Sequence, residues 1–172
     1  MGMTTIADNI RRLEEAVVRR PGFGRATCRS RTTLGDGLKC ISVEDDWTVD
    51  TDLPAALGGS SSAPTPGVLL RAALGACMAM SYRLRAERAG LGPFTVTVDV
   101  DADSQLAGML LATSAAPPGF TGIRYHVEVE CDAPHDDIRR VLDEGDRLSP
   151  MLDAIGRATT VKRSATIRPA GG

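Results

Sequence analysis

The sequence has few aromatic residues and no marked excess of charge of either sign. Aromatic side chains make up 3% of its 172 residues, which argues against a stacking surface for nucleic-acid bases. The formal net charge is −2, so the chain lacks the positive charge that attracts nucleic acids or anionic membranes. No apolar run reaches the roughly 20 residues that a membrane-spanning helix needs. We therefore expect neither a nucleic-acid partner nor a membrane partner.

Cysteine and histidine are also scarce. The four cysteines form no CxxC pair and, with only two histidines, show no spacing typical of a metal site; these residues are Cys28, Cys40, Cys77, Cys131, His126 and His135. The first residues lack the apolar segment and cleavage site of a secretory signal. We expect no metal and no cofactor, a cytoplasmic location and reduced thiols.

A loop rich in glycine, serine and proline spans residues 52–66, with the sequence DLPAALGGSSSAPTP. A glycine-rich loop before a helix can hold phosphate, but neither GxGxxG nor GxxxxGK[ST] is present, so nucleotide binding is not expected. Two interpretations remain: a linker, or a lid or positioning loop at the start of the next helix. The second is favoured because the loop is short, contains apolar residues such as Leu53 and Leu57, and leads directly into that helix.

The stretch from Pro64 to Gly90 predicts a helix of about 23 residues, with prolines before it and a glycine after it. Between Val68 and Met80 the only charged residue is Arg71, which is typical of a buried helix. Helical spacing places one set of residues on a common face: Leu70, Ala73, Leu74, Cys77, Met80, Ser81 and Leu84. Cys77 is therefore expected on a packed face.

The segment before the glycine-rich loop predicts one amphipathic helix and three strands. The helix begins at Thr4 or Thr5 and ends near Arg19, and the strands span residues 25–33, 38–44 and 47–51. Turn residues at 35–37 predict a hairpin centred after Leu34. In that register Cys28 and Cys40 do not face each other, so no disulfide is expected between them.

The segment after the long helix predicts further strands and one more helix. Residues 94–101 and 123–131 alternate between apolar and polar side chains, which predicts Cys131 in the core and His126 facing solvent. Residues 105–112 predict a strand or a loop. A helix follows from about residue 134 to Arg147, Ser149-Pro150 ends it, residues 151–155 form a short turn or helix, and 159–167 predict a last strand.

This order of elements predicts an α+β fold in a single domain that covers residues 1–172. Its parts are an N-terminal helix (1–22), a strand region with the glycine-rich loop (25–66), the central helix (67–89), a second strand region (94–131), and a helix with the last strand (134–168).

The segment LLRAALGACMAMSYRLRAERAG, preceded by a Gly-Gly and a proline-rich loop, resembles the central helix of the OsmC/Ohr proteins, the osmotically inducible and organic-hydroperoxide-resistance proteins. The resemblance extends more weakly from about Arg25 to Val161. It implies antiparallel sheets around the cysteine-bearing helix and an intertwined homodimer. It also implies a thiol peroxidase, in which a thiolate becomes sulfenic acid and a second cysteine captures it as a disulfide.

Only one of the four groups that the resemblance implies is present. Cys77 matches the first cysteine, but Ser149 stands in the place of the second. The family's glutamate follows a proline about ten residues before the first cysteine, and here Gly67 follows Pro66. No arginine lies between Ile41 and Leu70. The remaining candidates to activate the thiol lie further upstream: Arg25, Arg29 and Arg31.

Three interpretations of Cys77 follow. It is a small packing residue, or it is the nucleophile of a divergent peroxidase that an external thiol reduces, with Cys131 and Cys40 as weaker internal alternatives. In the third, the protein is non-catalytic and binds a small apolar ligand at the dimer interface, lined by Cys77, Leu74, Met78, Met80, Met151 and Leu152. A thiol pKa well below 7 would support catalysis, and one near or above 8.5 would support binding.

Overall fold

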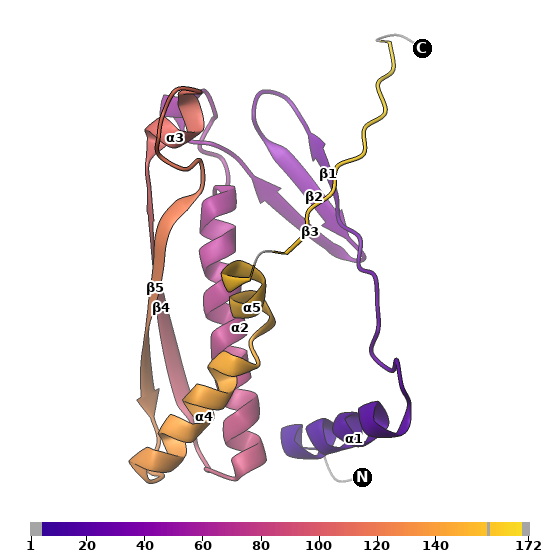
Figure 1. Cartoon of the computed structure of the whole chain (residues 1–172), viewed down its shortest axis with the longest axis vertical. Helices are drawn as coiled ribbons and strands as arrows, with labels where there is room; N and C mark the ends of the chain where they lie inside the picture. Colours follow the sequence, from indigo (N-terminus) through magenta and orange to yellow (C-terminus); the bar gives the residue numbers. More distant parts are fainter. Residues whose placement is uncertain (1–4, 158, 170–172) are drawn as a thin grey trace.

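The computed structural model describes residues 5–157 and 159–169 and has the predicted α+β architecture. Figure 1 shows a long helix, α2, with a two-stranded hairpin and two shorter helices packed along it. In chain order the elements are α1 (Ile6–Arg19), β1 (Arg31–Leu34), β2 (Cys40–Glu44), β3 (Trp47–Thr51), the 3-10 helix η1 (Ala55–Leu57), α2 (Pro66–Ala89), β4 (Thr95–Ser104), α3 (Leu106–Leu110), β5 (Phe120–Glu130), α4 (His135–Arg147) and α5 (Pro150–Gly156).

Helix α2 begins and ends where its sequence predicts. The Thr65 hydroxyl accepts a hydrogen bond from the backbone N–H of Val68, and Pro66 occupies the first helical position, where its missing N–H has no cost. Gly90 ends the helix in the left-handed region at φ 68°, a conformation that glycine adopts without strain. The predicted helix is thus confirmed, with 24 residues.

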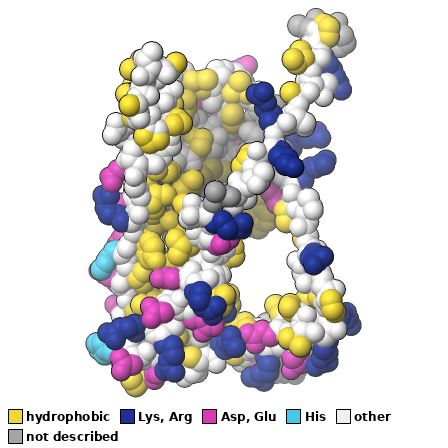
Figure 2. Space-filling model, viewed as in Figure 1, with side chains coloured by type: hydrophobic (Ala, Val, Ile, Leu, Met, Phe, Trp, Pro, Cys, Tyr) yellow, Lys and Arg dark blue, Asp and Glu magenta, His cyan; other side chains and the backbone are white. Residues whose placement is uncertain are grey.

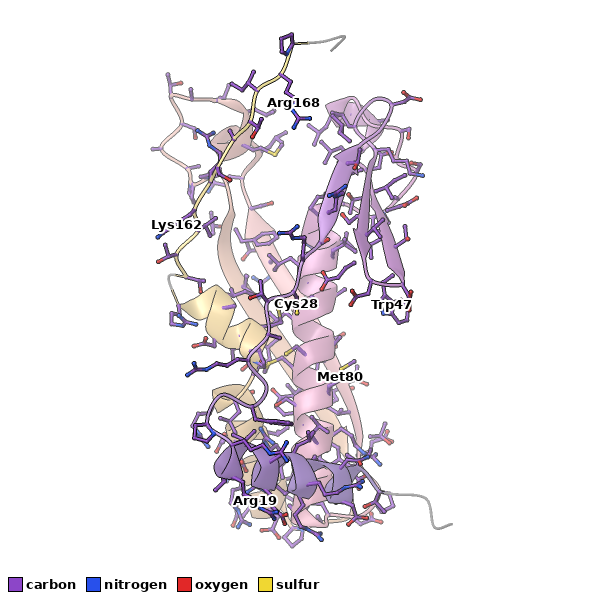
Figure 3. All side chains as sticks on the ribbon, turned by 90° about the vertical axis from the view of Figure 1, so that its right-hand side faces the viewer. Arg19, Cys28, Trp47, Met80, Lys162 and Arg168 are labelled. Carbon is purple, nitrogen blue, oxygen red and sulfur yellow. The ribbon has the colours of Figure 1, made fainter. Side chains whose placement is uncertain are left out.

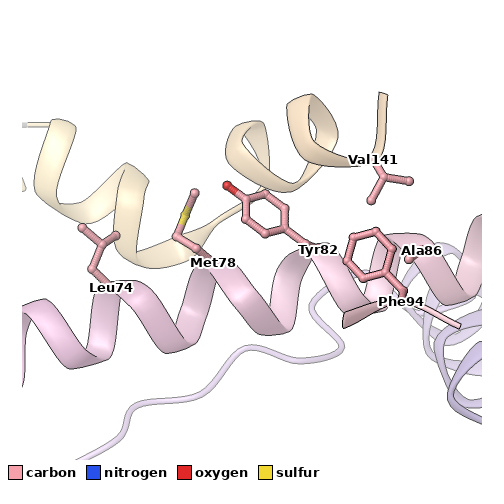
Figure 4. Packing of buried hydrophobic residues seen from close by; sticks show 6 residues of the cluster. All are labelled: Leu74, Met78, Tyr82, Ala86, Phe94 and Val141. Atoms are coloured by element: carbon pink, nitrogen blue, oxygen red, sulfur yellow. The ribbon is translucent and has the colours of Figure 1, made fainter. Parts of the chain in front are cut away.

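The core forms along α2 from residues spaced four apart. Leu74, Met78, Tyr82 and Ala86 are almost fully buried, and Phe94 and Val141 complete the cluster (Figure 4). Valines of β4 and β5 pack against it from the hairpin, and residues of α4 and α5 pack against it as well. The four-residue spacing keeps these side chains on one face of the helix.

The face predicted for α2 is partly wrong. Leu74 and Ser81 are buried as expected, but Met80 is 66% exposed and lies on the opposite side from α4 and α5 (Figure 3). Met80 is two positions after Met78, and two positions correspond to about 200° of rotation on an α-helix. The buried face is therefore rotated away from the predicted one.

Strands β4 and β5 form an antiparallel hairpin with Val98 opposite Val127. The predicted alternation is confirmed, because Cys131 packs on the core and His126 is exposed. The prediction of a strand or loop at 105–112 is wrong, since Leu106–Leu110 is the short helix α3. Its leucines, alanine and methionine are good helix formers, and they do not alternate with polar residues.

Strands β1, β2 and β3 form a separate antiparallel sheet in that order. The strand predicted at 25–33 forms only over Arg31–Leu34, because the earlier residues have no neighbouring strand within the described chain. Leu34 pairs with Cys40, so Cys28 is not opposite Cys40. Both thiols are free, as expected.

Helix α1 is amphipathic but buries none of its residues. Thr5 caps it, and the Asp8 side chain bonds back to the Thr5 backbone. Its apolar residues Leu13 and Val17 are exposed. An ion pair of 3.1 Å between Arg88 Nη1 and Glu14 Oε1 connects α1 to α2.

The predicted last strand at 159–167 is not formed. This segment extends past the helical core without joining either sheet (Figures 1 and 3), and Val161 and Ile167 are 92% and 94% exposed. A strand needs a neighbouring edge for its backbone hydrogen bonds, and this segment pairs with none of the edges of the two described sheets.

The chain exposes an unusually large surface. Its accessible area is 13,299 Å², whereas a compact monomer of its mass exposes about 8,100 Å². Figure 2 shows open space between α1, the segment that follows α1, and the helical core. A single copy therefore leaves much apolar surface uncovered.

Candidate functional site

The structure brings Cys77 and Ser149 together, although 72 positions separate them in the sequence. The sulfur of Cys77, in the middle of α2, lies 3.4 Å from the hydroxyl oxygen of Ser149. Ser149 is 1% exposed and precedes α5, and Cys77 is half-buried. These are the two positions at which the resemblance implies a pair of cysteines.

The surroundings of Ser149 orient its hydroxyl group. Its oxygen accepts a hydrogen bond of 3.3 Å from the backbone N–H of Leu152 and so caps α5. A hydroxyl has one proton and two lone pairs. With one lone pair engaged by Leu152, the proton is free to donate to the Cys77 sulfur, a bond that stabilises a thiolate relative to a thiol.

The close approach of α4 to α2 determines the distance between Cys77 and Ser149. One helical turn from Cys77, the Ser81 hydroxyl donates to the carbonyl of Gly145 at 3.1 Å. A Cβ atom on Gly145 would lie 2.8 Å from Tyr82 Cε1, so only glycine allows the two helices to pack at this distance. A glycine inside an amphipathic helix is a sequence signal of close approach, and sequence reasoning did not use it.

A polar cluster of Tyr82, Tyr125 and Asp146 holds α4 in place close to the bond between Ser81 and Gly145. The hydroxyls of Tyr82 and Tyr125 both donate to the carboxylate of Asp146, at 2.5 and 3.0 Å. Burial, together with the bond to Asp146, raises the pKa of Tyr82 and that of Tyr125. The cluster ties α2, β5 and α4 together next to the Cys77–Ser149 pair, and it too was not predicted from the sequence.

The loop at 52–66 is built around a buried carboxylate. Asp52 is 2% exposed and accepts hydrogen bonds from the hydroxyls and backbone N–H groups of Ser60 and Ser62, and from the N–H of Leu53. The Ser60 hydroxyl is the main reason that the pKa of Asp52 lies well below its usual value. This network gives the loop a defined shape where it leads into α2, as the favoured interpretation expects.

The arginines proposed to activate the thiol lie elsewhere in the single chain. Arg25 and Arg29 belong to the extended segment between α1 and β1, and Arg31 begins β1; all three are exposed. Among residues 5–157 and 159–169, no hydrogen bond or ion pair joins any of them to Cys77. Within one copy, therefore, none of these three arginines contacts the Cys77 thiol.

The residues predicted to line an apolar pocket are dispersed. Leu74 and Met78 belong to the buried core, Met151 and Leu152 pack against it half-buried, and Met80 is exposed on the other side of α2. None of them lines any of the three main cavities in the described part of the chain. The pocket stays a prediction for an assembled protein.

Two further features concern metals and membranes. In the part of the chain that the structure covers, no three His, Cys, Asp or Glu side chains are grouped closely enough to hold a metal ion. No helix in that part combines the length and the apolar character needed to cross a bilayer.

The sequence profile of the family described as OsmC-like protein matches residues 58–164. This range includes α2, the β4–β5 hairpin, α4 and α5, and therefore both Cys77 and Ser149. The chain belongs to the OsmC-like family. None of the curated proteins matches its sequence closely enough to count as a relative.

Solved structures of OsmC-like proteins share the fold of this chain. The OsmC-like protein of Mycoplasma pneumoniae is 14% identical with a TM-score of 0.65, over 77% of this chain and 89% of its own. An organic hydroperoxide resistance protein of Elizabethkingia anophelis is 18% identical with a TM-score of 0.54, over 77% and 89%. One from Legionella pneumophila, also 18% identical, has a TM-score of 0.53 over 76% and 89%.

Proposed function

We propose that this OsmC-like protein reduces organic hydroperoxides with Cys77 as its nucleophile, and that an external thiol returns Cys77 to its reduced form. The observation that carries the proposal is the 3.4 Å contact between the Cys77 sulfur and the Ser149 hydroxyl. It places the family's first cysteine in a half-buried site against a polar group that can stabilise a thiolate. Several of the structural relatives are described as hydroperoxide resistance proteins.

The reaction follows from the chemistry of a thiolate. The sulfur attacks one oxygen of the hydroperoxide, an S–O bond forms and the O–O bond breaks, and the alcohol leaves after it takes up a proton. Cys77 is oxidised to sulfenic acid and the hydroperoxide is reduced. The Ser149 hydroxyl donates to the sulfur before the attack and to the sulfenic oxygen after it.

Reduction of the sulfenic acid requires a thiol from outside the pair. A hydroxyl at position 149 forms no disulfide, so a small thiol attacks the sulfenic sulfur, water leaves, and a mixed disulfide forms. A second thiol then releases Cys77 and forms the disulfide product. Cys131 is not suited to this role, because its sulfur is directed to the Leu91 carbonyl at 3.6 Å.

We also propose that two copies form the working protein. The surface of a single copy exceeds that of a compact monomer by several thousand Å², which is more than enough for each copy to contribute its half of the roughly 2,000–5,000 Å² that obligate homodimers bury in total. The unpaired segments at 25–30 and 159–167 offer backbone hydrogen bonds to a second copy. We propose that in such a dimer Arg25, Arg29 or Arg31 of one copy contacts Cys77 of the other.

A second candidate function is the binding of a small apolar ligand at the dimer interface. It is favoured by one observation, that no cation contacts Cys77 among the described residues of the single chain. A thiol in apolar surroundings without a cation stays protonated. In this case Cys77 packs beside the ligand and does not react with peroxide.

The test is to count free thiols in the reduced protein after a modest excess of cumene hydroperoxide is added. We expect one thiol to disappear rapidly, with a mass increase of one oxygen, and no rapid loss in the Cys77→Ser variant. Addition of a small thiol should then restore the free thiol. If the wild-type protein reacts no faster than an ordinary free cysteine, the peroxidase proposal fails and the ligand-binding function is left.

A further inference from the structure

A cavity of about 540 Å³ lies at the N-terminal end of α2, and Cys77 is not among its lining residues. Its walls come from the loop after β3, the first two turns of α2, helix α3 and the start of β5. Most of this lining is apolar, including Leu53, Leu57, Leu70, Leu106, Met109 and Phe120. Cavities of this size commonly hold small molecules.

Arg71 is the one charged residue among those that line the cavity. It is half-buried, and among residues 5–157 and 159–169 it makes no ion pair and no side-chain hydrogen bond. Other arginines of α2 differ in this respect, because Arg83 pairs with Glu87 and Arg88 pairs with Glu14. A half-buried guanidinium keeps part of its hydration, and a carboxylate that enters the cavity can pair with it through charge-assisted hydrogen bonds.

The residue next to this guanidinium is a glycine. A Cβ atom on Gly67 would lie 3.7 Å from Arg71 Nη1 and 3.5 Å from Phe120 Cζ. This is the position after Pro66 at which the resemblance implies a glutamate. The chain therefore has no carboxylate where one would neutralise Arg71, and the space beside the guanidinium stays open to the cavity.

We propose that this cavity binds an apolar molecule that carries one carboxylate. The carboxylate pairs with Arg71 in the space that a glutamate at position 67 would occupy, and the apolar part of the molecule contacts Leu53, Leu57, Leu106 and Met109. The planar guanidinium forms two parallel hydrogen bonds with a carboxylate, which gives preference for this group over a neutral alcohol. Binding does not depend on the peroxide chemistry of Cys77.

The test is calorimetric titration of the full chain with octanoate and, separately, with 1-octanol. The Cys77→Ser variant is used so that thiol chemistry plays no part. We expect octanoate to bind and 1-octanol to bind about tenfold to a hundredfold more weakly, because it lacks the charge-assisted bonds. Equal affinity for the two would overturn the proposal, as would the absence of octanoate binding.

Two kinds of variant locate the site. Arg71→Met should weaken octanoate binding to the level of 1-octanol, whereas Arg88→Met, the same change at the other end of α2, should leave it unchanged. Gly67→Glu should also abolish octanoate binding, because the new carboxylate would pair with the Arg71 guanidinium in place of octanoate. Gly67→Ala adds a Cβ at ordinary contact distances and should leave binding intact.

Circular dichroism would reveal whether Arg71→Met folds. If it does not, the comparison of Gly67→Glu with Gly67→Ala still tests the proposal. Octanoate binding that persists in Gly67→Glu would overturn the proposal. So would equal losses in Gly67→Ala and Gly67→Glu. Because thiol counting with hydroperoxide is a separate measurement, failure here is distinguishable from failure of the proposed peroxidase function.

Discussion

The sulfur of Cys77 and the hydroxyl oxygen of Ser149 are 3.4 Å apart, one helical turn from the bond between Ser81 and Gly145. The two contacts follow the antiparallel course of α2 and α4, so the packing of these helices determines the distance between the two side chains. A thiol at position 149 would therefore lie within reach of Cys77.

The Ser149→Cys variant should recover a two-cysteine site. Disulfide bonds need Cβ atoms about 3.5–4.5 Å apart, which this packing is expected to provide with little movement. Mild oxidation with hydroperoxide should then consume two thiols per chain and remove two hydrogens from the intact mass. Peptide mapping would show Cys77 as one partner.

Ser81→Cys is the matched control for that experiment. Residue 81 is one turn from Cys77 on the same helix, where Cβ atoms are about 5–6 Å apart, too far for an unstrained disulfide. This variant should form no bond with Cys77. Disulfide formation in Ser81→Cys but not in Ser149→Cys would contradict the observed packing of α5.

Gly145→Ala should destabilise the protein by about 1–3 kcal/mol, the usual cost of overpacking. The added methyl group would meet the ring of Tyr82, so α4 must move away from α2. The same movement should lengthen the Cys77–Ser149 contact and slow the reaction of Cys77 with hydroperoxide. Urea unfolding and thiol counting measure the two effects.

Gly156→Ala, in the last turn of α5, serves as the control for Gly145→Ala. Nothing lies within 4 Å of a Cβ at this position, so its stability should be unchanged or slightly higher. Equal stability of the two variants would mean that α4 does not approach α2 as closely as described.

Asp52 should make stability depend on acidity. Its pKa is lower in the folded protein than the ordinary value of 3.8, chiefly because of the Ser60 hydroxyl. Its contribution is therefore complete at neutral pH and declines as the pH falls below that ordinary value towards the folded pKa. Asp52→Asn should lower the melting temperature at pH 7 and reduce its further fall between pH 5 and pH 2.

Asp36→Asn is the control for that titration, because Asp36 is exposed in the turn between β1 and β2. It should leave the acid dependence unchanged. If Asp52→Asn and the wild-type protein lose stability in parallel over this range, the hydrogen bonds to Asp52 do not determine the acid sensitivity.

A truncation after Arg157 should weaken the proposed dimer. The removed segment contains Val161 and Ile167, which are exposed in one copy and which the proposed dimer would cover. Light scattering on the eluting protein should give twice the chain mass of 18.1 kDa for the full chain and a lower average mass for the truncated one. A full chain that stays monomeric at high concentration would contradict the dimer proposal.

Much of the fold could be predicted from local patterns. Prolines before α2 and Gly90 after it predicted the helix, and alternation predicted β4 and β5, because these signals act within a few residues along the chain. Strand predictions failed at 25–30 and at 159–167, where the segments pair with no neighbouring strand in the structure. Whether such a segment pairs depends on another strand and not on its own sequence.

The sequence by itself determined which element carries Cys77, that Ser149 follows the last residues of a helix, and that no carboxylate follows Pro66. Only the tertiary structure decided that Ser149 contacts Cys77, that Asp146 joins two tyrosines, and that Arg71 faces an apolar cavity beside Gly67. The physical reason is distance along the chain. Capping and periodicity involve residues a few positions apart, whereas these contacts join residues on elements that meet only when α4, α5 and β5 pack against α2.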